Sequence, residues 1–183
     1  MSSSFHRARG RVAVRFDAAE AALLRKLFGE LVELLDDGTA AGGAGDDPLA
    51  SAVGTLEPRE VPEDPALARL FPDAYRDDDE AASDFRRYTE GDLRAGKIDA
   101  ARVVAESLGE GGRLVLTAEQ AKAWLTALND LRLTLGTRLS VTEDHEQVFG
   151  SLPDDDPRKQ LWYIYDWLSY LQQSLVETLA HDL

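Results

Sequence analysis

The 183-residue chain is long enough for one domain that buries most of its apolar surface, and 44% of its residues are hydrophobic. Its 34 acidic and 20 basic residues give a net charge of −14, which disfavours binding to phosphate backbones and anionic membranes, because such binding depends on Lys and Arg. The absence of cysteine excludes disulfides, thiolate metal sites and thiol redox switching by this chain.

The N-terminal region predicts a short strand followed by a long helix. Residues 11–16 alternate between apolar and polar side chains with a period of two, which is typical of a strand. Asp17 and Glu20 form a capping-box pattern, and leucines at helical spacing follow them. The helix ends before a stretch rich in Gly and Asp over about 37–47, which predicts a flexible loop.

The middle of the chain predicts further helices. Asp64-Pro65 marks a helix start, because proline is favoured at the first helical position. A second helix contains Phe85 and Tyr88, and the helical pattern continues over residues 98–108.

The opening pattern recurs at an offset of 100 residues. Residues 113–116 form a short apolar strand pattern, and Thr117 with Gln120 repeats the capping box. Two copies of one strand–cap–helix unit would pair their strands into a small ribbon and pack their helices together; chance similarity between amphipathic helices is the alternative. We therefore predict a mainly α, helical bundle-like single domain over 5–183, with a two-stranded β element near 11–16 and 113–116.

Arg132 is the least expected residue of the second repeated helix. Apolar residues at helical spacing form one stripe, and Arg132 projects only about 40° from Leu128, inside that stripe. A buried arginine must be paired or hydrated, since an unpaired buried charge is costly. Asp166 is the most attractive partner, and Asn129 and Asp130 are further candidates. We predict a polar network that either orients two helices or contacts a binding partner.

The last predicted helix, over about 157–180, is apolar or aromatic on nearly all sides. Leucines line one face, and the opposite side carries Trp162, Tyr163, Trp167 and Tyr170. Such a helix is either central to the core or covered by a second chain. Because Tyr and Trp are frequent contact anchors, these four aromatic residues are a candidate interface, and a homodimer is one form that it could take.

The sequence contains few residues that could form a catalytic or metal site. His145 lies beside Glu143, Asp144 and Glu146, and imidazole with carboxylates suits several divalent metals. No second histidine stands at helical spacing from His145, so a metal-dependent enzyme centred on this residue is only an alternative hypothesis. The sequence has neither a Gly-x-Ser-x-Gly elbow nor a phosphate-binding glycine loop. We expect no catalytic site, no metal site and no cofactor.

The N-terminus is the one basic segment. Arg7, Arg9, Arg11 and Arg15 precede the first acidic residue, and alternate positions of an extended chain lie on one face. This pattern fits a basic arm for DNA or an acidic protein, or a strand edge that charge protects from aggregation. The rest of the chain carries −18, from 16 basic and 34 acidic residues, which disfavours direct DNA binding.

The sequence predicts a cytoplasmic location. No apolar run approaches the roughly 20 residues of a membrane span. The first seven residues lack the apolar centre of a signal peptide.

Several stretches carry a family resemblance: WLTALNDLRLTLGTRL at 124–139, the following Thr142-Glu143, YDWLSYLQ at 165–172 and the opening at 11–16. They resemble an actinobacterial family long labelled as a domain of unknown function, which includes AosR-type oxidative-stress transcriptional regulators. The likeness spans almost the whole chain and implies a regulatory or partner-binding role. The redox-sensing form of that role uses a closely spaced cysteine pair, which this chain lacks.

We therefore expect a non-enzymatic regulatory protein that acts through protein–protein contacts. The first hypothesis is a transcription-associated regulator that binds a basic protein, such as part of the transcription machinery, because opposite charges are complementary. The second is an accessory factor for Clp-type proteolysis, because genes of the family tend to lie near those of the Clp adaptor ClpS and of sulfur assimilation.

Overall fold

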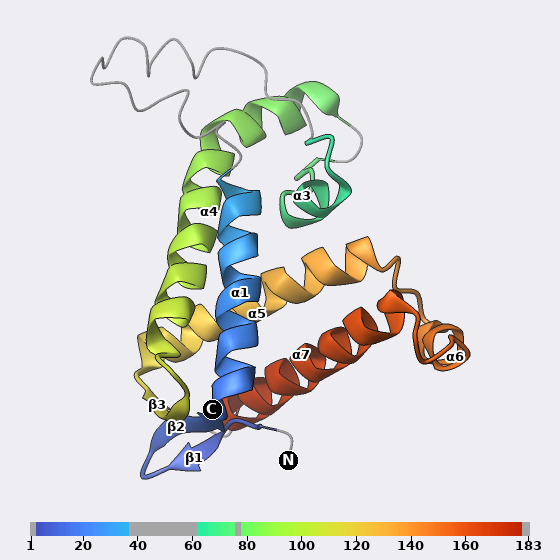
Figure 1. The fold of residues 1–183 in the computed structure, drawn as a ribbon. Coiled ribbons are helices and arrows are strands. Elements are labelled where there is room, and N and C mark those ends of the chain that lie inside the picture. The colour runs from blue at the N-terminus through green and yellow to red at the C-terminus, as the bar shows by residue number, and fades with distance from the viewer. Residues whose placement is uncertain (1–2, 37–61, 76–77, 181–183) are drawn as a thin grey trace.

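Helix α5 (Ala118–Arg138) is the central element of the fold (Figure 1). The computed structural model describes residues 3–36, 62–75 and 78–180, and within these ranges it has six helices and three strands, so the predicted mainly α fold is confirmed. The loop predicted over 37–47 lies outside the described residues. Helix α5 packs against four other helices: α1 (Ala18–Leu35), α3 (Pro65–Leu70), α4 (Asp79–Ser107) and α7 (Pro157–Ala180).

The predicted repeat of a strand, a cap and a helix is present in the structure. Strand β2 (Arg11–Phe16) leads into α1, and β3 (Gly112–Leu116) leads into α5. The two strands pair with each other, as the repeat predicted, and the structure shows that the pairing is antiparallel with Val14 opposite Leu114. Each helix starts with a reciprocal capping box, Asp17 with Glu20 and Thr117 with Gln120.

The sheet has a third strand, which was not predicted. Strand β1 (His6–Ala8) pairs antiparallel with β2, so the strand order is β1-β2-β3 and β2 is the central strand rather than an edge. Arg9 and Gly10 form the connecting turn with φ values of 52° and 78°. Two successive positive φ values are typical of a tight hairpin turn whose twist matches that of the strands. A three-residue strand is too short for alternation to reveal it.

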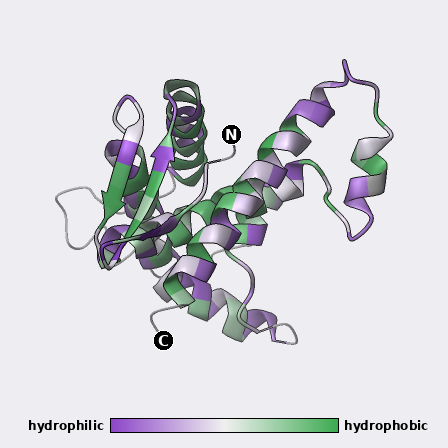
Figure 2. Ribbon diagram, turned by 90° about the horizontal axis from the view of Figure 1, so that it is seen from below, coloured by the Kyte–Doolittle hydropathy of each residue, from purple (hydrophilic) through white to green (hydrophobic). Residues whose placement is uncertain are grey.

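The hydrophobic core centres on Trp124 of α5, which is fully buried. Its ring stacks on Phe16 of β2 at 5.7 Å and meets Phe5 and Phe28 edge-on at 5.4 and 6.1 Å. The indole Nε1 donates a hydrogen bond to Ser107 Oγ at 3.1 Å, so the polar atom of this buried ring is satisfied. Both repeated units therefore contribute to one aromatic cluster. Figure 2 shows that hydrophobic and hydrophilic residues are interleaved along the helices.

The remaining helices cover this centre. Asp64 caps α3 through its side chain, and Pro65 is the first helical residue, as predicted. The two helical patterns of the middle region belong to one helix, α4, of 29 residues. Helix α6 (His145–Gly150) packs on α7, whose buried residues lie mostly in its C-terminal half. Within the described residues, none of the helices has the length and apolar character needed to cross a membrane.

Candidate functional site

The two tryptophans of the predicted α7 interface turn towards the protein. Trp167 meets Phe16 of β2 edge-on, with ring centroids 6.5 Å apart. Trp162 stacks on Phe149 of α6 at 6.2 Å, with an interplanar angle of 13°. These contacts hold α7 against the sheet and against α6, so the tryptophans serve packing within the chain.

The two tyrosines of the predicted interface lie on the exposed side of α7. Tyr163 is 56% exposed and Tyr170 is 47% exposed. They share one helical face, because seven residues are nearly two turns. Exposed polar residues at intervening positions extend this face, which we call the α7 outer face and define by Tyr163, Asp166, Tyr170, Gln173 and Glu177. It offers aromatic surface, amide and carboxylate groups to a partner.

Arg132 joins α5 to α7, as predicted, but through neutral partners. Its Nε donates a hydrogen bond to Ser169 Oγ at 3.0 Å, and its Nη1 donates to Gln172 Oε1 at 2.5 Å. Gln172 Nε2 in turn donates to Asn129 Oδ1 at 3.4 Å, so Asn129 belongs to the network. The guanidinium carbon lies 5.6 Å from the centre of the Tyr165 ring. The two helices are thus tied together without a carboxylate at Arg132.

The predicted pairing of Arg132 with Asp166 or Asp130 is wrong. Asp166 lies on the exposed α7 outer face and makes no ion pair within the described part of the chain. Asp130 accepts a hydrogen bond from Lys97 Nζ of α4 at 2.6 Å. The physical reason is helical geometry: Asp130 and Arg132 are two residues apart, about 200° around the helix, so their side chains point to different neighbours.

Burial dominates the electrostatics of Asp130. The residue is 1% exposed, and its Oδ2 atom has no hydrogen-bond partner among the described residues. Burial raises the pKa of the Asp130 carboxyl, and the hydrogen bond and positive charge of Lys97 offset only part of this effect. Asp130 is therefore a structural link between α5 and α4 rather than a partner of Arg132.

A second polar network, not anticipated from the sequence, lies along α4. Arg86, Glu90 and Arg94 are spaced four residues apart, and each is at most 5% exposed. Glu90 accepts hydrogen bonds from Arg86 Nη1 at 3.1 Å and from Arg94 Nη2 at 2.8 Å. Arg94 Nη1 also donates to the carbonyl of Leu35, the last residue of α1, at 2.6 Å. This network fixes the C-terminal end of α1 against α4.

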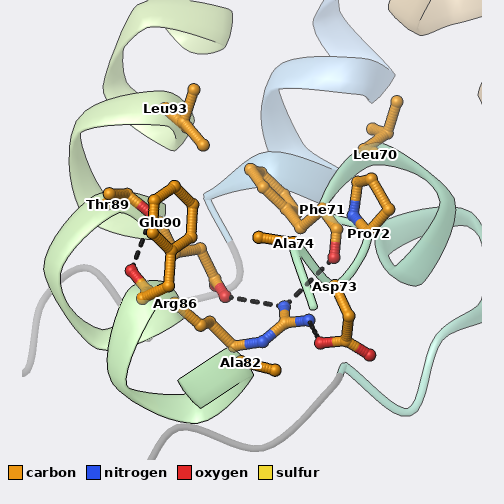
Figure 3. Close-up of a pocket in the computed structure, with 11 residues that line it drawn as sticks. Leu70, Phe71, Pro72, Asp73, Ala74, Ala82, Arg86, Thr89, Glu90 and Leu93 are labelled. Atoms are coloured by element: carbon orange, nitrogen blue, oxygen red, sulfur yellow. Dashed lines mark hydrogen bonds and ion pairs between the residues drawn. The ribbon is translucent and has the colours of Figure 1, made fainter. Parts of the chain in front are cut away.

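Arg86 forms part of the wall of a pocket of about 150 Å³ between α3 and α4 (Figure 3). Its Nη1 donates to the Phe71 carbonyl at 3.1 Å, and its Nη2 donates to Asp73 Oδ1 at 2.6 Å. Burial disfavours the charged form of Arg86, but hydrogen bonds to Asp73 and Glu90 outweigh it, so the pKa of Arg86 lies above its usual value. The charges that border this pocket already have partners, which leaves little for a ligand to bind.

One signal in the sequence could have revealed the α4 network. The spacing Arg86, Glu90, Arg94 places three charges on the helical face that continues into the apolar residues Ile98 and Ala101. Charges on an otherwise apolar face predict buried ion pairs. Phe85 and Tyr88, the two aromatic residues of the helix predicted in this region, are both exposed.

The predicted basic arm is part of the sheet. Arg11 and Arg15 are exposed residues of β2, and Arg15 is directly opposite Arg113 of β3. Arg9 is in the hairpin turn, and Arg7 is an exposed residue of β1. The arginines are therefore fixed on a folded surface instead of a free extended chain.

His145, the candidate metal ligand, begins α6. Its Nδ1 lies 2.6 Å from the Thr142 carbonyl oxygen, and its ring meets Tyr165 edge-on at 6.1 Å. Within the described residues, no group of three or more His, Cys, Asp or Glu side chains is arranged to hold a metal ion. The observed contacts give His145 a role in joining the α5–α6 connection to α7.

The chain is similar in sequence to several known proteins from mycobacteria. It is 38% identical over 175 residues to the oxidative stress regulator AosR of Mycobacterium tuberculosis (strain ATCC 25618 / H37Rv), covering 87% of this chain and 78% of the relative. The AosR of Mycobacterium bovis matches to the same extent, and a relative from Mycobacterium leprae is 33% identical over 174 residues. No solved structure matches this chain.

The family itself is shown by a match over nearly the whole sequence. Residues 2–179 match the family described as a domain of unknown function, DUF2017. The resemblance inferred from the sequence is confirmed, and relatives named as regulators support a regulatory role. The chain belongs to the DUF2017 family.

Proposed function

We propose that this protein is a cytoplasmic, non-enzymatic regulator of the oxidative-stress response that acts by binding another protein through the α7 outer face. The observation that carries the proposal is the pair of exposed tyrosines, Tyr163 and Tyr170, on a helix whose tryptophans are packed inward. Tyrosine is enriched at contact anchors because it combines apolar surface with a hydroxyl group. The similarity to named oxidative-stress regulators supplies the biological context.

Charge indicates the kind of partner. The α7 outer face carries Asp166 and Glu177, and the chain as a whole carries −14. Electrostatic complementarity therefore favours a partner with a basic surface, such as a component of the transcription machinery. Because the chain has no cysteine, its regulation must use a signal other than its own thiol oxidation.

Affinity capture with mass spectrometry tests the proposal when it compares three proteins. These are the wild type, the double variant Tyr163→Ser/Tyr170→Ser, and Tyr88→Ser, which removes a 67% exposed tyrosine from α4 as a matched control. We expect the wild type and the control to capture a transcription component in a salt-sensitive manner, and the double variant to lose it. Circular dichroism verifies that all three proteins are folded.

Other outcomes of these measurements would change the proposal in different ways. Selective capture of a Clp component would replace transcription by proteolysis as the regulated process. A wild-type dimer that becomes a monomer in the double variant, measured by analytical ultracentrifugation, would assign the α7 outer face to self-association. Equal capture by all three proteins would show that this face is not the binding surface.

A further inference from the structure

A second pocket, of about 360 Å³, lies between α3, α5 and α7. Its volume is within the range of small-molecule sites in proteins, roughly 300–1,000 Å³. Within the described part of the chain, two arginines and several hydroxyl groups border it, and no acidic side chain does. The polar lining consists of Arg69, Arg132, Thr137, Ser140 and Tyr165.

The positive charge of Arg132 is not neutralised by the protein groups around it. Its Nε and Nη1 donate to neutral oxygens of Ser169 and Gln172, and its third nitrogen, Nη2, makes no hydrogen bond among the described residues. The residue is half-buried, so water screens its charge only in part. An anion in the pocket would supply the missing opposite charge and accept from Nη2.

Arg69, a residue of α3, adds a second positively charged side chain to the pocket lining. It lies in the last turn of α3, is exposed, and makes no ion pair in the described ranges of the chain. Arg138 follows the pocket residue Thr137 in the sequence but does not line the pocket, and it differs from Arg69 because Asp64 Oδ2 accepts a hydrogen bond from its Nη2 at 2.6 Å. The two pocket arginines thus outweigh the partial negative charge of about −0.5 at the C-terminus of α5.

The backbone at the end of α5 shapes this pocket. Gly136 lets the Tyr165 ring approach closely, because an added Cβ would lie 3.1 Å from Tyr165 Cε2. Ser140 has a φ of 52°, and the amides of Ser140 and Val141 donate to the carbonyls of Thr137 and Gly136 at 3.1 and 2.9 Å. This is the helix-ending motif in which glycine is usual at the left-handed position. A serine there brings a hydroxyl group to the pocket at a cost in backbone strain.

We propose that this pocket binds a small molecule through an oxyanion group, either phosphate or carboxylate, held between Arg132 and Arg69. Arginine suits both groups because its planar guanidinium presents several donors in a fixed arrangement. Tyr165, Ser169 and Gln172 are residues of α7, so the ligand binds beside the helix that carries the α7 outer face. The site is independent of the proposed function, since it requires no protein partner.

Calorimetric titration at constant ionic strength tests the site, with inorganic phosphate and citrate as separate probes. The variants are Arg132→Leu and Arg69→Ser, and the matched control is Arg102→Ser, which removes an exposed arginine of α4 that does not border the pocket. We expect saturable binding to the wild type and the control, and at least about tenfold weaker binding to each pocket variant, because a charge-assisted hydrogen bond is lost. Urea unfolding verifies that the variants are folded; if Arg132→Leu is not, Arg69→Ser alone decides.

The two probes distinguish the ligand class, since phosphate binding alone indicates a phosphorylated ligand and citrate binding alone indicates a carboxylic acid. The proposal is overturned if neither probe binds the wild type up to about 10 mM. It is also overturned if Arg102→Ser weakens binding as much as the pocket variants do. Either result would leave the α7 outer face and its protein partner unaffected.

Discussion

The α4 network and the surroundings of Arg132 show two ways in which one fold accommodates a guanidinium group. On α4, Arg86 and Arg94 are almost fully buried and share the carboxylate of Glu90. On α5, Arg132 is half-buried and contacts a hydroxyl, an amide and an aromatic ring, all of them neutral. The first arrangement neutralises its charges internally, and the second leaves a positive charge facing a pocket.

This difference separates charges that serve only the folded structure from charges that remain able to bind an external ion. A fully buried arginine requires an opposite charge nearby, because desolvation of an unpaired ion costs several kcal/mol. A half-buried arginine can be satisfied by neutral groups and water, so it remains able to bind an external anion. Degree of burial and the charge of the partners, rather than residue type, therefore distinguish the two sites.

Glu90→Gln breaks the buried α4 network and should have one of the largest effects on stability. It leaves Arg86 and Arg94 buried without their shared negative charge, and we expect a loss of about 3–5 kcal/mol in the free energy of unfolding. Urea unfolding followed by circular dichroism measures this loss. Glu106→Gln, at an exposed position of the same helix, is the control and should change stability by less than about 0.5 kcal/mol. A loss below about 1 kcal/mol for Glu90→Gln would contradict the internal-neutralisation argument.

Replacement of Asp130 should have a smaller effect on the free energy of unfolding, and this effect should depend on pH. Because burial raises its pKa in the folded state, the folded protein binds this proton more tightly than the unfolded chain does. The resulting stabilisation is fully present below the unfolded pKa and is lost as the pH rises through the folded pKa. The difference in unfolding free energy between wild type and Asp130→Asn should therefore move in favour of the wild type on acidification from pH 7 towards about pH 4.

Urea unfolding of both proteins at a series of pH values measures this trend. The opposite trend would mean that the ion pair with Lys97 outweighs burial. Glu119→Gln, an exposed carboxylate change at the start of α5, is a suitable control and should show little pH dependence of its own.

Arg132→Leu should cost less than about 1.5 kcal/mol, because it removes two hydrogen bonds to neutral groups and no ion pair. The matched variant Arg86→Leu removes one partner of a buried pair and should cost about 3–5 kcal/mol. Comparison of the two unfolding free energies tests the distinction between the sites directly. Equal losses would show that Arg132 is as much a structural residue as Arg86.

The repeated strand–helix unit could be predicted from sequence because its signals are local. Capping boxes and helical spacing depend on residues a few positions apart, and both boxes form as expected. Strand β1 was missed because three residues carry almost no pattern, and it exists through pairing with β2.

The partners of charged residues were harder to predict, because a single sequence does not show which helices are neighbours. Arg132 was correctly placed between α5 and α7, yet its partners are Ser169 and Gln172 rather than a carboxylate. Charge complementarity alone favoured Asp166, which the rotation of α7 places on the exposed side. Tertiary packing, which sets that rotation, decided between these candidates.

Ser140→Gly should have the smallest effect and the opposite sign. The left-handed conformation costs a non-glycine residue about 1–2 kcal/mol, and the greater freedom of glycine in the unfolded chain offsets part of the gain. We expect a net stabilisation of about 0.5 kcal/mol, measured as a rise in Tm of about 1–2 °C. Ser140→Ala is the control, since it removes the hydroxyl group, keeps a Cβ in the left-handed conformation and should not stabilise. If the Ser140 hydroxyl contacts an anion, both variants should bind phosphate or citrate more weakly than the wild type, while only the glycine variant should be more stable. The two measurements together would separate the backbone strain at Ser140 from the contribution of its hydroxyl group to anion binding.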